Sequence, residues 1–202
     1  ALISVFDKNK IENICHILSK NNIEIYSTGG TFDYIKQLGI KIKKVEDLTL
    51  YPSILNGRVK TLHPKVFGGI LKTNSKSDLD DSKKYEIPDI DLVVVDLYPF
   101  EETVKNSNNH EDIIEKIDIG GVSLIRAAAK NYENVVCISS KDQYDELVSI
   151  LNNGCKTDIE YRKKLAYEAF QKSSDYDFKI SSYLGSESIN LNFEKDTIKE
   201  LR

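Results

Sequence analysis

The stretch Asp91–Leu97 reads D-L-V-V-V-D-L and is the strongest strand signal in the chain. Its apolar residues occupy consecutive positions, which is typical of a strand covered on both faces in a parallel sheet. On both sides of this stretch, short apolar runs alternate with segments whose apolar residues recur at helical spacing. The predicted strands are Leu2–Val5, Ile23–Tyr26, Ile40–Val45, Asp91–Leu97 and Val135–Ile138, with Gly68–Leu71 as a further short strand. This alternation predicts an α/β fold with a mainly parallel, doubly wound sheet, whose ligands bind at the carboxyl ends of the strands.

The segments between these strands differ in their patterns. Apolar residues at helical spacing follow the first strand, and Gly39 ends a helix that follows the second. Glu46–Pro64 shows no periodicity, and Thr73–Tyr85 is polar and is interpreted as a surface excursion. Further helices are predicted at Glu111–Ile117, after Gly121, at Lys141–Leu151 and, as one or two helices, over Asp158–Leu184.

Composition excludes several classes of protein. The 202 residues suffice for one sizeable core, and a net charge of −4 without a basic stripe argues against a nucleic-acid surface. No apolar run approaches the roughly 18 residues of a membrane span, so no membrane association is expected. Cys15, Cys137 and Cys155 lack metal-ligand spacing and are interpreted as reduced residues of a cytoplasmic protein. The absence of Met indicates that residue 1 is not the natural start.

Two of the predicted strands end in loops suited to an anion. Phe6-Asp7-Lys8 places a cation after the first strand, although Asp7 could equally be a helix cap. Ser27–Thr31 reads S-T-G-G-T and offers hydroxyl groups beside backbone N–H donors, which suits a phosphate; a plain tight turn is the alternative. The nucleotide-triphosphate and dinucleotide spacings are missing, which favours a monophosphate.

Three further stretches carry polar groups in unusual settings. Arg58–Pro64 reads R-V-K-T-L-H-P and places two cations in an aperiodic loop, where they suit an anionic ligand or form a solvated turn. His63 could transfer protons or serve a structural hydrogen bond. Val95–Phe100 places an acid and a tyrosine at a strand end. Asp118–Asn131 reads D-I-G-G-V-S-L-I-R-A-A-A-K-N, in which two glycines let a flat ligand approach the backbone.

These motifs, taken together, closely resemble the inosine monophosphate (IMP) cyclohydrolase domain. R-V-K-T-L-H-P, L-Y-P-F, I-D-I-G-G and R-A-A-A-K-N follow S-T-G-G-T in the order and spacing of that family, over Leu2 to about Leu184. In the family this domain is the N-terminal half of a bifunctional purine-biosynthesis protein, and the other half is the aminoimidazole carboxamide ribonucleotide transformylase. The resemblance implies a three-layer, methylglyoxal-synthase-like α/β/α domain over residues 1–184. Residues 185–202 are predicted to be a linker towards an absent transformylase domain.

The resemblance also implies the chemistry. The carboxamide nitrogen of a formamidoimidazole ribonucleotide attacks its own formyl carbon, and water leaves to give IMP. The reaction is intramolecular, so holding the two groups together supplies much of the acceleration. No metal or organic cofactor is implied for cyclisation, whereas the transformylase half would use 10-formyltetrahydrofolate. The implied partners are purine nucleotide monophosphates, the transformylase domain and a second copy of the chain in a homodimer.

Site residues follow by position from the same resemblance. Lys130 matches the family's proton donor and acceptor, and Lys60, Tyr98 and Asp118 match its supporting catalytic groups. We expect Asp118 to orient or deprotonate the amide and Lys60 with Tyr98 to stabilise the leaving oxygen. The implied substrate-binding residues are Phe6, Asp7, Lys8, Thr28, Gly29, Gly30, Thr31, Arg58, Val59, Lys60, Thr61, Val95, Asp96, Asp118 and Ile119.

Three details of this assignment stand out. A straight helix over Val122–Lys130 would separate its ends by roughly 12 to 15 Å, which makes a direct Asp118–Lys130 pair difficult. Phe6 replaces a serine and Asp96 an asparagine that relatives often carry, and the second change gives an acceptor-only group.

Two other functions share the expected fold. One is a ligand-sensing regulatory domain of the kind appended to carbamoyl phosphate synthetase, and the other is a methylglyoxal-synthase-type phosphate lyase. Neither is expected to carry R-V-K-T-L-H-P or R-A-A-A-K-N, which favours the cyclohydrolase.

Overall fold

A parallel sheet forms the centre of the molecule. The computed structural model describes the backbone of residues 1–190. The five strands lie in the order β3-β2-β1-β4-β5, and every neighbouring pair is parallel. Leu2 in the central strand pairs with Tyr26 on one side and Val93 on the other. The strands are β1 Leu2–Ser4, β2 Tyr26–Ser27, β3 Lys43–Lys44, β4 Leu92–Val95 and β5 Val136–Ile138.

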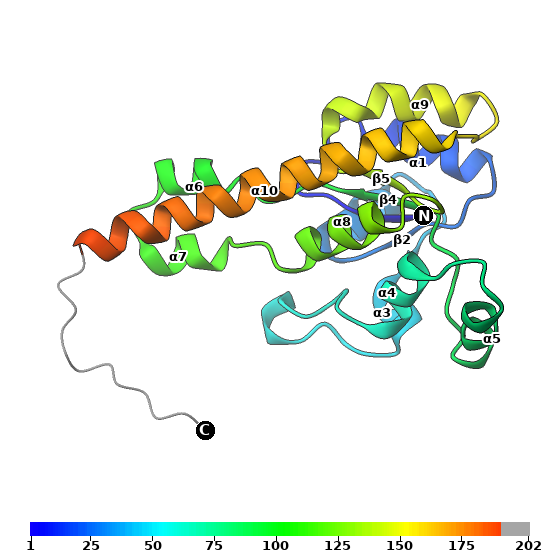
Figure 1. The fold of residues 1–202 in the computed structure, drawn as a ribbon, viewed down its shortest axis with the longest axis horizontal. Helices are drawn as coiled ribbons and strands as arrows, with labels where there is room; N and C mark the ends of the chain where they lie inside the picture. Colours follow the sequence, from blue (N-terminus) through cyan, green and yellow to red (C-terminus); the bar gives the residue numbers. More distant parts are fainter. Residues whose placement is uncertain (191–202) are drawn as a thin grey trace.

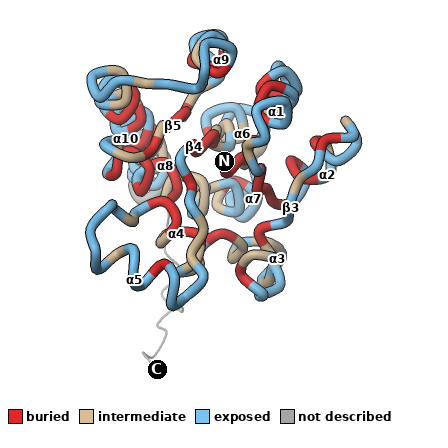
Figure 2. Tube along the Cα trace, turned by 90° about the vertical axis from the view of Figure 1, so that its right-hand side faces the viewer, coloured by how far each residue is buried: buried red, intermediate tan, exposed pale blue. Residues whose placement is uncertain are grey.

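Helices cover both faces of the sheet, as Figures 1 and 2 show. One face packs against α1 (Ile11–Lys20), α2 (Gly29–Gln37) and α9 (Tyr144–Asn152). The other face packs against α4 (Pro64–Leu71), α8 (Gly120–Lys130) and α10 (Ile159–Asn190). The predicted α/β architecture with a doubly wound parallel sheet is therefore confirmed.

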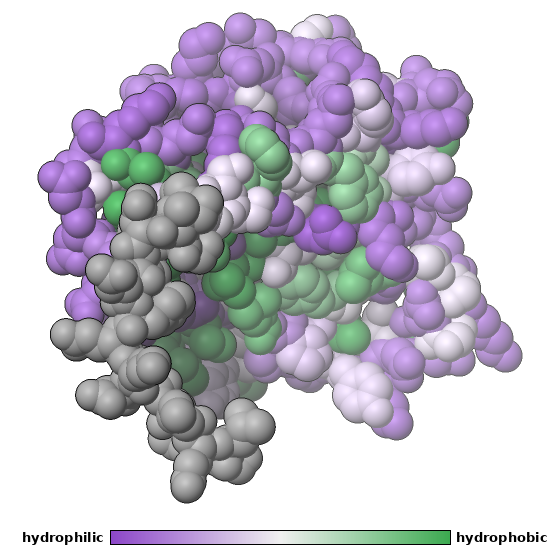
Figure 3. Space-filling model, turned by 60° about the vertical axis from the view of Figure 1, so that its left-hand side comes forward, coloured by the Kyte–Doolittle hydropathy of each residue, from purple (hydrophilic) through white to green (hydrophobic). Residues whose placement is uncertain are grey.

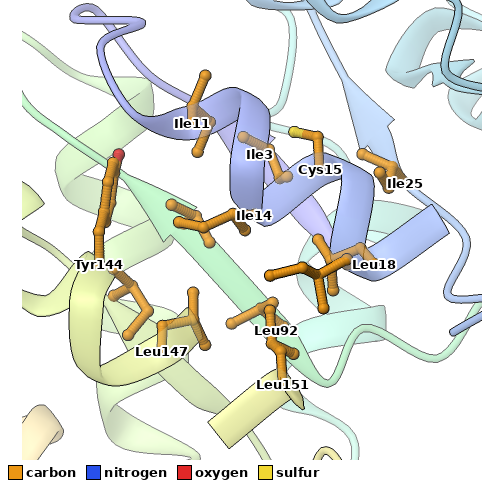
Figure 4. Packing of buried hydrophobic residues seen from close by; sticks show 14 of the residues in the cluster. Ile3, Ile11, Ile14, Cys15, Leu18, Ile25, Leu92, Tyr144, Leu147 and Leu151 are labelled. Carbon is orange, nitrogen blue, oxygen red and sulfur yellow. The ribbon is translucent and has the colours of Figure 1, made fainter. Parts of the chain in front are cut away.

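The strand residues alternate between two buried clusters. Ile3 and Leu92 face Ile14 of α1 and Leu147 of α9, as the close view in Figure 4 shows. Their neighbour Val93 points to the opposite cluster with the small residues of α8 and α10. All of β4 is buried, in agreement with the consecutive apolar residues that predicted it.

The remaining elements lie outside this sandwich. Among the described residues they are the helices α3 (Val45–Thr49), α5 (Lys76–Lys84), α6 (Phe100–Asn106) and α7 (His110–Glu115), and the 3-10 turns Leu55–Gly57 and Lys141–Gln143. The C-terminal part of α10 extends past the sheet and lies between α6 and α7 in Figure 1. There Phe100, Ile113 and Tyr176 form a small third cluster. The face in Figure 3 shows a band of apolar side chains within a hydrophilic surface. Within residues 1–190, no helix has both the length and the apolar character that crossing a bilayer requires.

Several element predictions are wrong in detail. Gly68–Leu71 is the last part of helix α4, not a strand. Its glycines permit close packing, because a Cβ at Gly69 would lie 2.9 Å from the carbonyl oxygen of Pro88. The predicted strand Ile40–Val45 shrinks to the exposed edge strand β3, and α3 begins at Val45. The polar stretch Thr73–Tyr85 is on the surface but contains α5.

The C-terminal helix is longer than predicted. The predicted stretch Asp158–Leu184 lies almost wholly in a single helix, α10, which begins at Ile159 and continues without a break to Asn190. Residue 184 is therefore not the end of an element, and the domain boundary placed there stays a prediction. Most of the predicted linker, residues 191–202, lies outside the described residues.

Candidate active site

The loop after β1 is held by the loop after β4. The N–H groups of Phe6 and Asp7 both donate to the carboxylate of Asp96, the second at 3.0 Å. Burial raises the pKa of Asp96, and these two N–H donors lower it in part. An acceptor-only group at position 96 therefore fits two backbone donors. Asp7 does not cap α1: it accepts the N–H of Asn9 and forms an ion pair with Lys141, which lowers the pKa of Asp7.

The S-T-G-G-T loop is the start of helix α2. Gly29 has a φ of +53°, a left-handed conformation that favours glycine. The hydroxyl of Ser27 donates to Ile3 O at 2.6 Å, and that of Thr31 donates to Val5 O at 2.8 Å. These two hydroxyls therefore fasten the loop to β1. The Thr28 hydroxyl is buried and has no hydrogen-bond partner within the described residues.

Two lysines lie over the glycines of this loop. A Cβ built on Gly29 would lie 3.3 Å from Lys60 Nζ, and one built on Gly30 would lie 3.9 Å from Lys8 Nζ. The N-terminus of a helix attracts anions through its unpaired N–H groups and its dipole. With two ammonium groups and the Thr28 hydroxyl beside it, this end of α2 is suited to a phosphate group.

The R-V-K-T-L-H-P segment does not directly follow a strand of the sheet. It comes after α3 and a 3-10 turn, and Val59 forms an isolated bridge with Ile54. Lys60 faces the S-T-G-G-T loop, and the buried Thr61 lies against Gly120, whose Cβ would be 3.2 Å from its hydroxyl oxygen. The segment therefore connects the S-T-G-G-T loop with the start of α8.

Arg58 and His63, at the two ends of this segment, make structural contacts. Arg58 donates from Nε and Nη2 to Glu115 of α7, the shortest distance being 2.6 Å. The Nδ1 atom of His63 accepts the N–H of Lys65 at 3.1 Å and so caps α4. This hydrogen bond supports the interpretation that His63 has a structural role.

Asp118 occupies the turn between α7 and α8. Its Oδ1 accepts the N–H of Gly121 at 2.6 Å. Burial raises the pKa of Asp118, the N–H groups of Gly121, Val122 and Tyr98 lower it, and the charge of Asp96 raises it. A Cβ at Gly121 would lie 2.6 Å from Asp118 Oδ2, so the second glycine makes room for this carboxylate.

Aromatic and apolar groups surround the same region. The rings of Tyr98 and Phe6 lie 5.1 Å apart, and Lys116 Nζ lies 5.6 Å from the Tyr98 ring centre. Phe6, Tyr98 and Ile119 are exposed, between 41% and 57%. Val95 is buried in β4 and contributes no accessible side chain.

Lys130 lies apart from this cluster. It is the last residue of α8, and Asp118 precedes the first residue, so the helix separates them by about 15 Å at 1.5 Å per residue. Lys130 lines a groove of 590 Å³ with Phe67, Tyr132 and Phe170, between α4, α8 and α10. A single chain thus brings together Lys8, Lys60, Tyr98 and Asp118, but not Lys130.

Sequence reasoning missed three residues around Asp118. Glu115 binds Arg58, Lys116 contacts the ring of Tyr98, and Tyr176 of α10 accepts the N–H of Asp118 at 2.8 Å. None belongs to a recognisable motif, and the pattern around Tyr176 was interpreted only as a packed helix. The only signal in the sequence was that Glu115 and Lys116 are charged residues next to the I-D-I-G-G motif.

This parallel sheet, with helices on both faces and a loop suited to an anion at the carboxyl end of β2, defines an α/β domain of the MGS-like class. The MGS-like domain family model matches residues 10–123, and the chain belongs to this family. A second model, the AICARFT/IMPCHase bienzyme, matches residues 128–202.

Individual relatives agree with this assignment. The bifunctional purine biosynthesis protein PurH of Bacteroides thetaiotaomicron is 54% identical over 91% of this chain and 36% of its own length. That of Clostridioides difficile is 45% identical over 97% of this chain and 40% of its own length. The chain therefore spans well under half of these relatives. A solved structure titled "Crystal structure of ForH" has a TM-score of 0.82 and 34% identity, covering 92% of this chain and 96% of that one. The resemblance inferred from the motifs is confirmed.

Proposed function

We propose that this domain is an IMP cyclohydrolase that closes the purine ring of 5-formamidoimidazole-4-carboxamide ribonucleotide with reversible loss of water, the last step of de novo purine biosynthesis. The observation that carries the proposal is the position of Lys60 and Thr61. One lies against the phosphate loop and the other against the turn that holds Asp118. A nucleotide whose phosphate binds at Gly29 and Gly30 would then present its base towards Asp118 and Tyr98.

The phosphate end of the site would bind the substrate. Lys8 and Lys60 supply charge, and the Thr28 hydroxyl and the first N–H groups of α2 supply hydrogen bonds. Phosphate binding would hold the carboxamide and formyl groups in the conformation in which they react. Such fixing is effective for an intramolecular reaction between a weak nucleophile and a weak electrophile.

The base end would handle the proton and the oxygen. The carboxamide nitrogen bonds to the formyl carbon and loses one proton. The formamide nitrogen loses a second proton and forms the C=N bond of the ring as the C–O bond breaks, and the oxygen takes up both protons and leaves as water. Asp118 would accept or orient the amide proton, since its raised pKa makes it a stronger base than an exposed aspartate. Lys60 and Tyr98 would stabilise the negative charge that develops on the oxygen.

Lys130 stays a predicted proton carrier. Within one chain, α8 separates Lys130 from Asp118. The predicted role therefore requires the two side chains to lie closer together than they do in a single chain. Lys130→Ala should abolish cyclisation while nucleotide binding persists if that prediction holds. Normal turnover of this variant would remove Lys130 from the mechanism.

The wider assignment rests on the relatives. In the reverse direction the reaction hydrolyses a cyclic amidine, which places the enzyme among the hydrolases of class EC 3.5.4. We propose that the domain works in the cytoplasm, as a homodimer, next to a transformylase domain. The AICARFT/IMPCHase match and the PurH relatives support that domain neighbour.

The test is the absorbance change on mixing the protein with synthetic formamidoimidazole carboxamide ribonucleotide, in EDTA and without folate. IMP should form at a rate proportional to protein concentration, and Asp118→Asn, whose rate should be at least about 100-fold lower, serves as the control. Binding of the nucleotide without any turnover would contradict the proposal and favour the ligand-sensing domain. Release of phosphate from dihydroxyacetone phosphate would favour the lyase.

A further inference from the structure

A tyrosine from the C-terminal helix lies beneath the turn that carries Asp118. Tyr176 of α10 is buried, with 6% of its surface exposed. Its hydroxyl oxygen accepts the N–H of Asp118 at 2.8 Å, and its proton is donated to Lys116 O at 3.2 Å. Its ring packs edge-on against Phe100 at 6.2 Å. One hydroxyl group therefore binds the backbone on both sides of Ile117.

Both backbone groups need such a partner. Lys116 is the C-cap residue of α7, directly after Glu115, and carbonyl groups at a helix end lack partners within the helix. The Asp118 N–H lies in a turn next to a partly buried carboxylate, where an unpaired donor is unfavourable. Burial raises the pKa of Tyr176 to about 12, so its hydroxyl stays protonated near neutral pH and can both donate and accept.

The contact fixes the carboxylate as well as the backbone. Asp118 is held at its side chain by the Gly121 N–H and at its main chain by Tyr176. Without Tyr176 the side-chain bond would remain, but the turn could move as a unit with α7. A displacement of about 1 Å in a catalytic group can lower a rate by about 100-fold.

We propose that Tyr176 is a positioning residue for the cyclisation, which holds Asp118 in line with the reacting amide through the Asp118 backbone and does not itself contact substrate. The inference rests on the proposed function for its catalytic part. The contact itself is independent of any ligand.

The test compares Tyr176→Phe with Tyr161→Phe on the same helix. Both substitutions keep the ring and remove one buried hydroxyl, but the Tyr161 hydroxyl has no hydrogen-bond partner within the described residues. Tyr176→Phe should lower kcat about tenfold and leave KM within about twofold, because the phosphate site is untouched. Tyr161→Phe should leave both constants within about twofold. Equal losses in the two variants, or normal kcat in Tyr176→Phe, would overturn the proposal.

A double-variant cycle tests whether Tyr176 acts through Asp118. In an Asp118→Asn background, Tyr176→Phe should change the residual rate by less than about twofold, since the group it positions is already lost. An additive tenfold loss would show that Tyr176 acts on something else.

Amide hydrogen exchange of Asp118 without ligand separates this inference from the proposed function. Exchange should become at least about tenfold faster in Tyr176→Phe and stay unchanged in Tyr161→Phe. Unchanged exchange in Tyr176→Phe would refute the contact. If the wild-type protein formed no IMP, the proposed function would fail, and the positioning role with it, whereas the exchange would still decide the contact.

Discussion

At Asp118, burial and hydrogen bonding act on the carboxyl group in opposite directions. Burial is the larger effect and raises the pKa, while three N–H donors lower it. A carboxyl group with a raised pKa is less stable as an anion in the folded chain than in the unfolded chain. Its contribution to stability is therefore present at low pH and lost as pH rises through the folded-state pKa. Ionised Asp118, which is proposed as the base, therefore lowers the stability of the folded chain at neutral pH.

Asp118→Asn separates stability from activity. The amide oxygen can still accept the Gly121 N–H, and the unfavourable charge is gone. We expect the variant to unfold at a higher temperature than wild type at pH 7, with the difference shrinking as pH falls towards 4. Cyclisation should fall at least about 100-fold. A lower unfolding temperature at pH 7 would show that ionised Asp118 stabilises the fold.

Gly29 and Gly39 form a natural pair for testing the phosphate loop. Both have positive φ, but only Gly29 has an ammonium group, that of Lys60, within 4 Å of the position of a Cβ. Alanine at either position should destabilise the fold by about 1–2 kcal/mol. Only Gly29→Ala should weaken binding of a nucleotide monophosphate, which calorimetry would measure. Equal affinities in the two variants would place the phosphate elsewhere.

At the scale of elements, an ion pair joins the segment of residues 50–63 to α7. Within the described chain, the Arg58–Glu115 pair is the hydrogen-bonded ion pair that joins this segment to α7. Exposed ion pairs contribute little in general, but two-point contacts between Arg and a carboxylate are the favourable exception. The pair holds the segment from which Lys60 and Thr61 reach the site.

Exchanging the two charges tests this tether. Arg58→Glu alone should raise the KM about tenfold, because the segment is released and repelled by Glu115. The double variant R58E/E115R should return KM to within about threefold of wild type. Failure of this rescue would mean that Arg58 contacts the nucleotide directly, as the sequence predicts.

Sequence patterns predicted elements where burial alone determines structure. β4 is buried on both faces, and its apolar residues reveal it. The strand predicted at Gly68–Leu71 was wrong. Its two glycines lie in helix α4, where another segment of the chain packs too closely for a larger residue. The S-T-G-G-T turn between a strand and a helix could be predicted, since its glycines and hydroxyl residues are consecutive in sequence; that it binds phosphate stays a prediction. The contact of Tyr176 with Asp118 could not, because 58 residues separate them and only the path of α10 brings them together.

At the scale of the molecule, the site lies where loops after β1, β2 and β4 meet at one edge of the sheet. The chain carries a net charge of −4, yet Lys8 and Lys60 converge on Gly29 and Gly30. The proposed attraction for a phosphate would therefore be local and would not come from the overall charge.

Ligand binding should stabilise the whole fold. At 100 times its dissociation constant, IMP should contribute about 2.7 kcal/mol, which corresponds to roughly 5–10 °C in a domain of this size. Inosine, which lacks the phosphate, should shift the unfolding temperature by less than about 1 °C at the same concentration. Equal shifts from the two compounds would show that the phosphate is not what the domain recognises.

The position of Tyr176 late in the sequence bears on how the chain folds during synthesis. The S-T-G-G-T loop is synthesised before the turn of Asp118, and Tyr176, whose hydroxyl contacts this turn, comes later still. All five strands and the residues proposed to bind phosphate are therefore synthesised before most of α10, which covers one face of the sheet and carries Tyr176. Cyclisation should therefore begin only after α10 has been made, and a chain whose translation is arrested between residues 140 and 175 should form no IMP.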